Sequence, residues 1–405
     1  MGVAVLHIAD WLLWGIMAVS TGYALVFALA SLLPKGGSRP SPPLSGDAPE
    51  QLRAPSSSFL VLFPAYREDR VIVHSVETFL RQDYPKDSFQ LCVISDHMEP
   101  ATNERLAQLP VVLLTPDFEK SSKAKALQYA IEKVEKGEQT GRRFDYVVIL
   151  DADNLVGEDF LTRLNGVCND GYQAIQCHRT AKNADNGIAA LDGASEEINN
   201  SIFRRGHNRL GLSSALIGSG MCFSYLWFSR HVGHLSSAVE DRELEALLMR
   251  QGIYIHYAED IYVMDEKVSS SDNFQRQRLR WMTGQIQTLL LMLPHVPKAM
   301  LQGNINYLDK TFQQALIPRS LLLVFIVLFS AIMLVAAPAR SLKWLMLLGL
   351  LVVTLLVAIP RRMRNRRLLV RALSFPRLAW HMVSNLLHID TSNKEFLHTT
   401  HGENV

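Results

Sequence analysis

The sequence predicts an α/β domain with a parallel sheet, attached to three membrane-spanning helices. Segments with the apolar patterns of strands and helices alternate over about ninety residues from position 59, as in a parallel sheet covered on both faces. Three long runs without charged residues lie before position 34 and after position 320. Residues 145–154 read D-Y-V-V-I-L-D-A-D-N, in which the apolar run is too short for an ordinary helix and suits a buried strand.

The uncharged runs have the composition of transmembrane helices. Trp11–Leu33 is long enough to cross a bilayer, and Leu321–Ala337 and Trp344–Ile359 are slightly shorter runs that predict a hairpin. Buried core helices are the alternative, which the nearly unbroken Leu, Val, Ile and Met composition disfavours. A cleaved signal peptide is disfavoured for the first run, because it lacks a basic start and a small-residue cleavage site.

Basic residues set the expected orientation in the bilayer. Lys35 follows the first run, and arginines at positions 361, 362, 364, 366 and 367 follow the last one. Because Lys and Arg gather in cytosolic loops, three crossings place residues 35–320 and the C-terminal tail in the cytosol. The net charge of +2 is nearly neutral, so the sequence gives no electrostatic case for a nucleic-acid partner.

The region between the first and second runs is assigned from its apolar spacing. Residues 34–58 are rich in Pro, Ser and Gly and predict a linker. Strands are predicted at 59–63, 91–95, 111–114 and 146–150, and helices at 71–82, 122–136, 240–250 and 274–293. The last of these helices has a basic start and an apolar second half, which suggests a helix that lies against the membrane surface.

Two carboxylates, Asp151 and Asp153, stand where the central strand ends. Ligands of open α/β sheets bind at the carboxyl ends of strands. Two hard oxygen ligands one residue apart suit a Mg²⁺ or Mn²⁺ ion that holds a diphosphate. A polar turn is the alternative, because Asp and Asn favour turns, and the tripeptide alone leaves both interpretations open.

Three other motifs also have both a functional and a structural interpretation. Gly218-Ser219-Gly220 provides a permissive backbone that can approach a ligand, although a plain turn is the simpler explanation. Glu240 and Asp241 open a helix, where acidic residues also stabilise the N-terminus. Lys123 begins another helix, whose charge and exposed N–H groups favour a phosphate, with surface solvation as the alternative.

The order and spacing of these motifs resemble those of family 2 glycosyltransferases. The chain places Asp96 at the end of the second strand, then Asp151-Ala152-Asp153, then Asp241, and then Gln277–Trp281 after thirty-five intervening residues. This is similar to the D, D-x-D, D, Q-x-x-R-W signature of membrane-embedded synthases of the cellulose, chitin and hyaluronan type. Supporting matches are Pro64–Glu68, Gln82–Pro85, Lys123–Gln128 and Trp281–Gln285.

The resemblance implies a GT-A fold, which is a Rossmann-like fold that binds nucleotide sugars, in a multi-pass protein of a bacterial inner membrane. The expected parts are an N-terminal transmembrane helix (1–33), a linker (34–58), a cytosolic GT-A domain ending in an interfacial Q-x-x-R-W helix (59–300), an interfacial connector (301–319), a transmembrane hairpin (320–360) and a cytosolic tail (361–405). In the tail, Phe396–His401 resembles the F-x-V-T-x-K gating loop of cellulose synthase-like enzymes, with His398 and His401 replacing Val and Lys. A disordered terminus is the alternative.

The resemblance also implies which residues bind the donor. Asp96 would contact the uracil or the ribose, and Lys123 a phosphate. Asp151 and Asp153 would hold Mg²⁺ or Mn²⁺ on the diphosphate. Gln277 would add a hydrogen bond to the nucleotide sugar.

A second group is implied to act in catalysis and on the acceptor. Asp241 would be the general base, because an acceptor hydroxyl is a poor nucleophile until a positioned carboxylate takes its proton. Arg280 would bind the donor and stabilise the charge of the leaving diphosphate. Trp281, Glu240 and Gly220 would contact the acceptor.

The expected function is inverting transfer from a UDP-sugar to a growing β-linked polysaccharide. Three spans are few for a polymer channel, so a homo-oligomer or an export partner is expected to complete one. Transfer of a single sugar to a lipid or short glycan is the main alternative. A nucleotide-sugar sensor without activity is disfavoured because it needs no general base, and a transporter because the hairpin lacks ionisable or broken helical segments.

Overall fold

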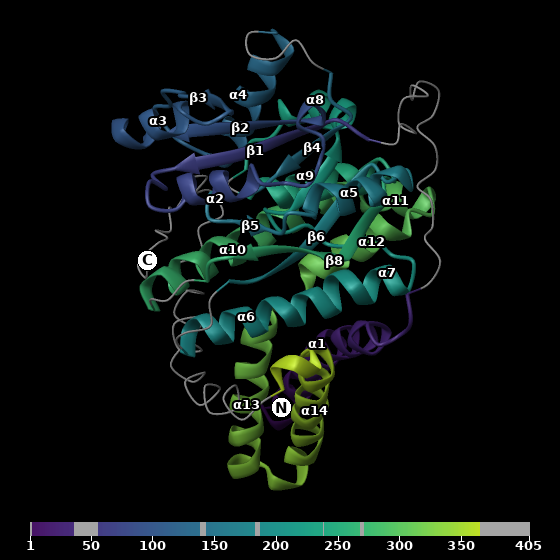
Figure 1. Cartoon of the computed structure of the whole chain (residues 1–405). Helices are drawn as coiled ribbons and strands as arrows, with labels where there is room; N and C mark the ends of the chain where they lie inside the picture. The colour runs from purple at the N-terminus through teal and green to yellow at the C-terminus, as the bar shows by residue number, and fades with distance from the viewer. Residues whose placement is uncertain are drawn as a thin grey trace.

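The computed structural model describes residues 2–35, 56–137, 143–182, 187–237, 239–267 and 271–364. Most of the predicted linker lies outside these residues, and so does the predicted gating segment Phe396–His401. An α/β domain forms one end of the molecule, and three helices project from it as a stalk (Figure 1).

A mixed sheet is at the centre of the α/β domain, with eight strands in the described residues in the order β3-β2-β1-β4-β7-β6-β8-β5. The strands are β1 (Phe59–Tyr66), β2 (Phe89–Asp96), β3 (Val112–Leu114), β4 (Tyr146–Ile149), β5 (Leu155–Val156), β6 (Ala174–Ala181), β7 (Met221–Ser224) and β8 (Ile255–Asp265). β1 to β4 pair in parallel as predicted. Beyond the predicted alternation, β7 is antiparallel to both β4 and β6, so the sheet as a whole is mixed. The strand–helix alternation that imposes parallel pairing stops after β4.

β1 is longer than predicted, because Pro64 does not end it. Along Phe59–Leu62 the strand has a neighbour on each side, whereas beyond Leu62 it pairs with β2 alone. Proline lacks an N–H to donate, and it is tolerated where one side of a strand is unpaired. The additional residues carry Tyr66 to the same edge of the sheet as Asp96.

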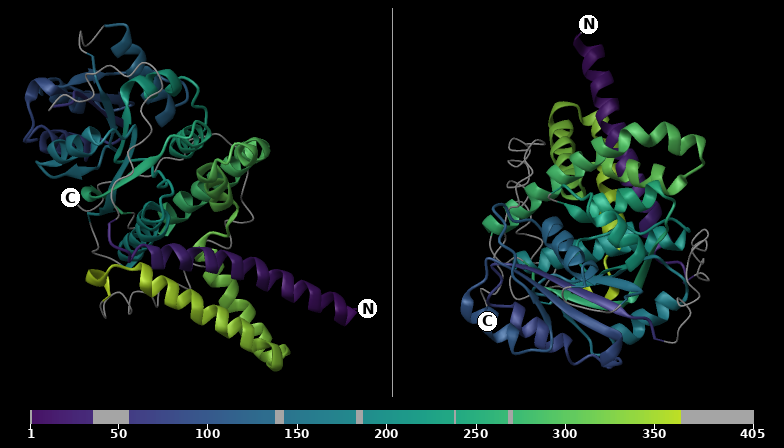
Figure 2. Two further views of the ribbon diagram at one scale, coloured as in Figure 1. Left: turned by 90° about the vertical axis from the view of Figure 1, so that its right-hand side faces the viewer. Right: turned by 90° about the horizontal axis from the view of Figure 1, so that it is seen from above.

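Helices cover both faces of the sheet, as predicted, and each face has its own buried apolar cluster (Figure 2). One face packs against α2 (Ile72–Phe79), α3 (Pro100–Ala107) and α5 (Phe160–Asn169), and the other against α4 (Lys123–Glu135), α8 (Tyr225–Val232) and α9 (Glu240–Arg250). α9 begins and ends at the predicted residues, and α4 differs from its prediction by one residue at each end.

A further layer of helices lies on the side of the sheet that faces the stalk (Figure 1). It contains α6 (Gly187–Asn199), the π-helix η3 (Asn200–Gly206), α7 (His207–Arg209), α10 (Ser271–Met292), α11 (Val296–Leu301) and α12 (Ile305–Ala315). Large apolar side chains from the end of α10 to the start of α12 are exposed, and Leu301 is 90% exposed. A segment that lies on a membrane surface needs an exposed apolar face. The exposed side chains are consistent with the predicted interfacial role of this region, which stays a prediction.

The stalk consists of α1 (Gly2–Ala30), α13 (Arg319–Ala336) and α14 (Pro338–Ala358). In the described part of the chain, these three helices are long and apolar enough to cross a membrane. The first begins earlier and ends sooner than the predicted Trp11–Leu33. Asp10 does not interrupt it, because the Asp10 carboxylate accepts hydrogen bonds from Lys343 Nζ (2.6 Å) and Trp344 Nε1 (2.8 Å) on α14.

The last turns of α1 are fixed against the α/β domain. A Cβ atom at Gly206 would lie 2.1 Å from the backbone oxygen of Phe27, so glycine permits this helix crossing. The ring of His207 stacks on Phe27 with ring centroids 3.7 Å apart. Tyr23 Oη donates to the Asp309 carboxylate at 2.8 Å and lies 2.9 Å from His207 Nε2. These contacts join the stalk to the domain as one unit.

Candidate active site

The two predicted metal ligands lie together at the carboxyl end of β4. The backbone N–H of Asp151 donates to Asn154 Oδ1 (3.0 Å) and to Ser219 Oγ (3.1 Å), which fixes the turn. Asp153 is buried, and its carboxylate accepts hydrogen bonds from the backbone N–H of Glu266 (2.8 Å) and from Asn154 Nδ2 (3.1 Å). The Asp151 side chain is 32% exposed, so it is the more accessible of the two carboxylates.

Lys123 reaches this turn from the first residue of α4. Its ammonium group forms an ion pair with Asp151, donates to the backbone oxygen of Gly218 at 2.6 Å, and lies 3.5 Å from Glu240 Oε1. Burial lowers the pKa of Lys123, but the charges of Asp151 and Glu240 outweigh it, so the pKa lies above its ordinary value. The predicted phosphate-binding cation is therefore charged and adjacent to the predicted metal ligand.

Asp96 lies at the end of β2, beside the end of β1. It is buried, and its Oδ1 lies 2.6 Å from Nδ1 of His97. Arg67 and His97, which follow β1 and β2, both have positive φ angles (54° and 55°). Non-glycine residues in this conformation cluster at ligand sites. His97 belongs to none of the sequence motifs, and its strained backbone is visible only in the fold.

The predicted base, Asp241, is in the first turn of α9. One of its oxygens accepts a hydrogen bond from the backbone N–H of Arg242 at 2.9 Å, and the other faces Gly218. The preceding Glu240 is 7% exposed, and burial, reinforced by the charges of Asp241 and Asp151 and opposed by Lys123, raises its pKa to about 7. Glu240 and Asp241 are therefore adjacent in the sequence but differ in their surroundings, because Glu240 lies beside Lys123 and Asp241 faces Gly218.

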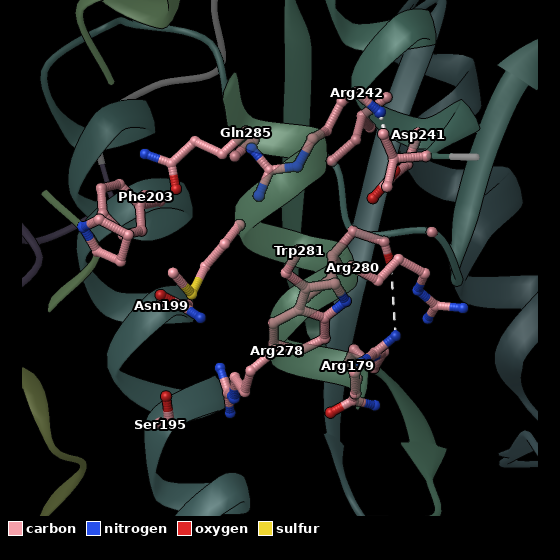
Figure 3. Close-up of a pocket in the computed structure, with 18 of the residues that line it drawn as sticks. Arg179, Ser195, Asn199, Phe203, Asp241, Arg242, Arg278, Arg280, Trp281 and Gln285 are labelled. Atoms are coloured by element: carbon pink, nitrogen blue, oxygen red, sulfur yellow. Dashed lines mark hydrogen bonds between the residues drawn. The ribbon is translucent and has the colours of Figure 1, made fainter. Parts of the chain in front are cut away.

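The Q-x-x-R-W segment of α10 faces these carboxylates (Figure 3). Burial lowers the pKa of the Arg280 guanidinium, and the nearby charges of Glu240 and Asp241 oppose that shift. The guanidinium of Arg278 lies 4.5 Å from the ring centroid of Trp281. Gln277 Oε1 is buried without a hydrogen-bond partner among the described residues, which suits an atom that contacts a ligand.

Arg179 of β6 is a site residue that the sequence did not reveal. Its guanidinium lies 3.2 Å from Asp265, 3.7 Å from Glu196 and 4.0 Å from Asp151. Burial lowers the pKa of Arg179, but these carboxylates outweigh it and the pKa is raised. No motif marks this arginine, because its partners come from β8, α6 and the central turn.

All but one of the predicted site residues line a single cavity of about 950 Å³. The lining includes Asp96, Lys123, Asp151, Asp153, Glu240, Asp241, Gln277, Arg280 and Trp281. Gly220 is the exception, so its predicted acceptor contact is not supported. It has a φ of +65°, and a Cβ atom there would lie 3.0 Å from Val263, because this residue packs inside the sheet. Gly218 lines the cavity instead.

Asp151 and Asp153 fit a divalent cation whose remaining ligands come from the phosphate oxygens of a bound nucleotide sugar. The part of the chain that the structure covers contains no group of three or more His, Cys, Asp or Glu residues that could hold a metal ion. Mg²⁺ is commonly bound by one or two carboxylates together with phosphate oxygens and water. Asp151 and Asp153 provide that number of carboxylates, with the cations of Lys123 and Arg280 nearby for a diphosphate.

Two family models match the chain. The model described as glycosyl transferase family group 2 matches residues 146–357, which is just over half of the 405 residues, and the model described as glycosyl transferase family 2 matches residues 60–229. A comparison with curated proteins gave no match.

Several solved structures are similar to this chain. A mannosyltransferase from Pyrobaculum calidifontis, solved with GDP-mannose and Mn²⁺, has 15% identity and a TM-score of 0.52, with 85% of this chain and 95% of that chain covered. This likeness shows the GT-A fold. S. aureus TarS (residues 1–349) has 14% identity, a TM-score of 0.41 and coverage of 83% and 90%. Glucosyl-3-phosphoglycerate synthase from Mycobacterium tuberculosis has 17% identity, a TM-score of 0.38 and coverage of 61% and 84%.

The extent of the family match, together with a GT-A fold and a cavity at the carboxyl ends of its strands, establishes the family. The chain belongs to the family 2 glycosyltransferases and is a transferase enzyme.

Proposed function

We propose that this chain is a membrane-bound, inverting glycosyltransferase that uses a UDP-sugar and a divalent metal ion and adds the sugar to a glycan or glycolipid hydroxyl. The arrangement of Lys123, Asp151 and Asp241 around one cavity carries this proposal. The mannosyltransferase that shares the fold was solved with a nucleotide sugar and Mn²⁺, which supports the metal and the donor class. UDP rather than GDP is proposed from the sequence resemblance.

The residues divide the chemistry between donor and acceptor. Asp151 and Asp153 would hold Mg²⁺ or Mn²⁺, which supplies positive charge to the leaving diphosphate. Lys123 and Arg280 would stabilise the same charge through direct contacts. Asp96 and Gln277 would hold the remainder of the nucleotide sugar.

Asp241 would take the proton of the acceptor hydroxyl. At the same time, the oxygen of that hydroxyl bonds to C1 of the sugar, and the bond from C1 to the diphosphate breaks. One displacement inverts the configuration at C1. Glu240 has a pKa near 7, so it is largely protonated below that pH and cannot then accept a proton. Trp281 would offer an aromatic face to the acceptor.

Polysaccharide growth is the more specific form of this proposal. It is supported by the presence of Gln277, Arg280 and Trp281 on the wall of the same cavity. Because the described residues include three candidate spans, a polymer channel would need a second copy or an export partner. Transfer to a lipid-carried acceptor needs no such channel.

We also infer that the catalytic domain is cytosolic. Lys35 follows α1, and Arg361, Arg362 and Arg364 follow α14, so basic residues gather at the ends of the spans nearest the domain. Labelling of a single cysteine introduced at exposed Asp260 by an impermeant thiol reagent tests this. Labelling in intact cells would contradict a cytosolic domain, and labelling only in opened membranes would support it.

The test of the reaction uses the purified full-length protein in nanodiscs. Nucleotide release is measured with common UDP-sugars and GDP-mannose, with Mg²⁺, Mn²⁺ or chelator, and labelled product is sized on a gel. Asp241→Asn is expected to reduce turnover by about 10²-fold or more, the usual contribution of a general base. Asp260→Asn, which removes an exposed carboxylate, is the control and retains turnover.

Each outcome separates the alternatives. Metal-dependent release that Asp241→Asn abolishes supports the mechanism, and high-molecular-weight product supports a polymer synthase. Full turnover in Asp241→Asn removes this residue as the base. Nucleotide binding without turnover on any donor, when glycan and lipid acceptors are supplied, identifies a sensor.

A further inference from the structure

The cavity does not end at the catalytic carboxylates. It continues past Trp281 toward α6 and the π-helix, where Ser195, Asn199 and Phe203 face it (Figure 3). It then reaches the ends of all three spans that lie nearest the α/β domain. Its lining there consists of Ser20, Tyr23 and Ala24 of α1, Leu322 and Leu323 of α13, and Val352, Leu355, Leu356 and Ile359 at the end of α14. The catalytic cleft and the spans therefore share one continuous space.

The part of the cavity between the spans is mostly aliphatic, with Ser20 and Tyr23 as its polar residues. Val352 and Leu356 line the cavity and are 42% and 47% exposed. In a bilayer, the surroundings of these spans are hydrocarbon. A sugar chain in this space would lose many hydrogen bonds to water and gain few replacements, whereas a hydrocarbon chain has none to lose. The lining thus favours an acyl or prenyl chain as the occupant.

Arginines and carboxylates meet where the aliphatic part joins the catalytic part. α6 supplies three carboxylates, and each has an arginine partner. Arg278 pairs with Asp192, Arg204 with Glu196 at 3.2 Å, and Arg362 with Glu197 at 2.8 Å. The acidic residues of this helix are therefore already compensated.

Arg319 lines the cavity together with Arg204 and Arg278, but it forms no such pair. Its guanidinium donates to the neutral oxygens of Ser195 (3.0 Å) and Asn199 (2.8 Å). In the described part of the chain, no carboxylate lies within ion-pair distance of it; Glu196 acts on it only from farther away. Arg319 is also the first residue of α13, where the helix dipole disfavours a cation. A half-buried cation in this position calls for an anionic ligand in the cavity that it lines.

The ligand chemistry follows from these neighbours. A guanidinium recognises a phosphate by paired hydrogen bonds, and it does so better than an ammonium group. Arg364 adds a second positive charge to the cavity lining, where it donates to the backbone oxygens of Ile359 (2.9 Å) and Val357 (3.2 Å). The cavity therefore has an aliphatic part between the spans, a cation at the inner end of that part, and the proposed base beyond it. This arrangement fits an acceptor with an apolar chain and an anionic headgroup.

We propose that the acceptor is a membrane lipid that carries a phosphate, with its chain between α1, α13 and α14 and its phosphate against Arg319. The hydroxyl that attacks lies on the headgroup beyond the phosphate, past Trp281 and next to Asp241. Its oxygen bonds to C1 of the donor sugar, its proton goes to Asp241, and the electron pair of the breaking C1–oxygen bond leaves with the nucleoside diphosphate. The product is the same lipid with one more sugar. This inference rests on the proposed function.

The test uses photoactivatable lipids in nanodiscs that contain the full-length protein. Phosphatidylglycerol and phosphatidylcholine probes carry a diazirine in the acyl chain, and labelled peptides are identified by mass spectrometry. The phosphatidylglycerol probe is expected to label peptides from α13 and the end of α14 at least fivefold more than the phosphatidylcholine probe. Arg319→Gln should abolish this preference and Arg319→Lys should restore part of it. Arg361→Gln, an exposed arginine at the same end of the stalk that does not line the cavity, is the control.

A second arm follows the transferred sugar. Labelled donor is added to nanodiscs made from the lipids of the source membrane, and the products are separated into organic and aqueous phases. Label on an anionic lipid, reduced at least fivefold in Arg319→Gln, supports the proposal. Equal labelling by both probes, or a labelled product that is neutral or soluble in water, overturns it. Without nucleotide release from any donor, the proposed function itself fails, while the photolabelling still reports whether the cavity holds a phospholipid.

Discussion

Glu240 provides the sharpest test of the electrostatic description of this site. Burial is the largest cause of its raised pKa, which rises from 4.5 to about 7, and each pKa unit corresponds to about 1.4 kcal/mol. The shift therefore corresponds to about 3 kcal/mol. A carboxyl group whose pKa is higher in the folded protein contributes its full stabilisation below pH 4.5 and loses it as the pH rises through 7. The ligand-free enzyme should become less stable across this window.

Glu240→Gln removes this titration while keeping the shape of the side chain. We expect the free energy of unfolding of the variant, relative to the original protein, to increase by about 3 kcal/mol between pH 4.5 and pH 8. For domains of 150–250 residues, 1 kcal/mol changes the melting temperature by about 2–4 °C, so the two pH profiles should diverge by about 6–12 °C.

The measurement is the apparent melting temperature of the ligand-free protein in detergent with chelator, followed from pH 4.5 to 8.5. Glu104→Gln, which removes an exposed carboxylate from α3, is the control and should follow the profile of the original protein. Parallel profiles for Glu240→Gln and the original protein would refute the reasoning, because they would mean that Glu240 titrates alike in the folded and unfolded chains.

Two other substitutions test particular contacts. Lys123→Met removes the cation that pairs with Asp151. By calorimetry, Mn²⁺ should then bind about tenfold more tightly in the absence of nucleotide, whereas the UDP-sugar should bind more weakly. An unchanged affinity for Mn²⁺ would contradict competition between Lys123 and the metal for Asp151. Gly206→Ala places a methyl group against the backbone of Phe27 and should destabilise the protein by about 1–3 kcal/mol in thermal unfolding. Gly166→Ala, an exposed helical position with open space around it, is the matched control and should not destabilise.

Periodicity and strand ends predicted the half of the domain that contains β1 to β4, where we propose that the donor binds. The short apolar run before Asp151 suited a buried strand, and parallel pairing through β1 places Asp96 of β2 at the same edge of the sheet. The start of α9 at Glu240 was predicted at the correct residue because acidic residues precede an amphipathic run. These signals are local, so one sequence contains them.

Contacts between distant segments left no such signal. Arg179 lies in a strand whose pattern is unremarkable, and its partners Asp265 and Glu196 come from other elements. Gly220 looked like a ligand-facing glycine, but its positive φ serves the entry into β7 and a close approach to Val263. A glycine motif shows that the backbone needs freedom, and only the fold shows whether a ligand or another strand needs the space.

The two ends of the cavity are connected through one carboxylate of α6. Glu196 lies 3.7 Å from Arg179, which is near Asp151 of the central turn. It also lies 3.2 Å from Arg204, which lines the part of the cavity toward the spans. Lys267, at 3.8 Å, completes its cationic surroundings. Burial raises the pKa of Glu196, but the three cations outweigh it and the pKa lies below its ordinary value. Glu196 also acts on Arg319 through its charge. A diphosphate near Arg179 and a lipid phosphate on Arg319 would therefore each change the balance of charge around this one carboxylate. The donor and acceptor sites that we propose are therefore electrostatically coupled through α6.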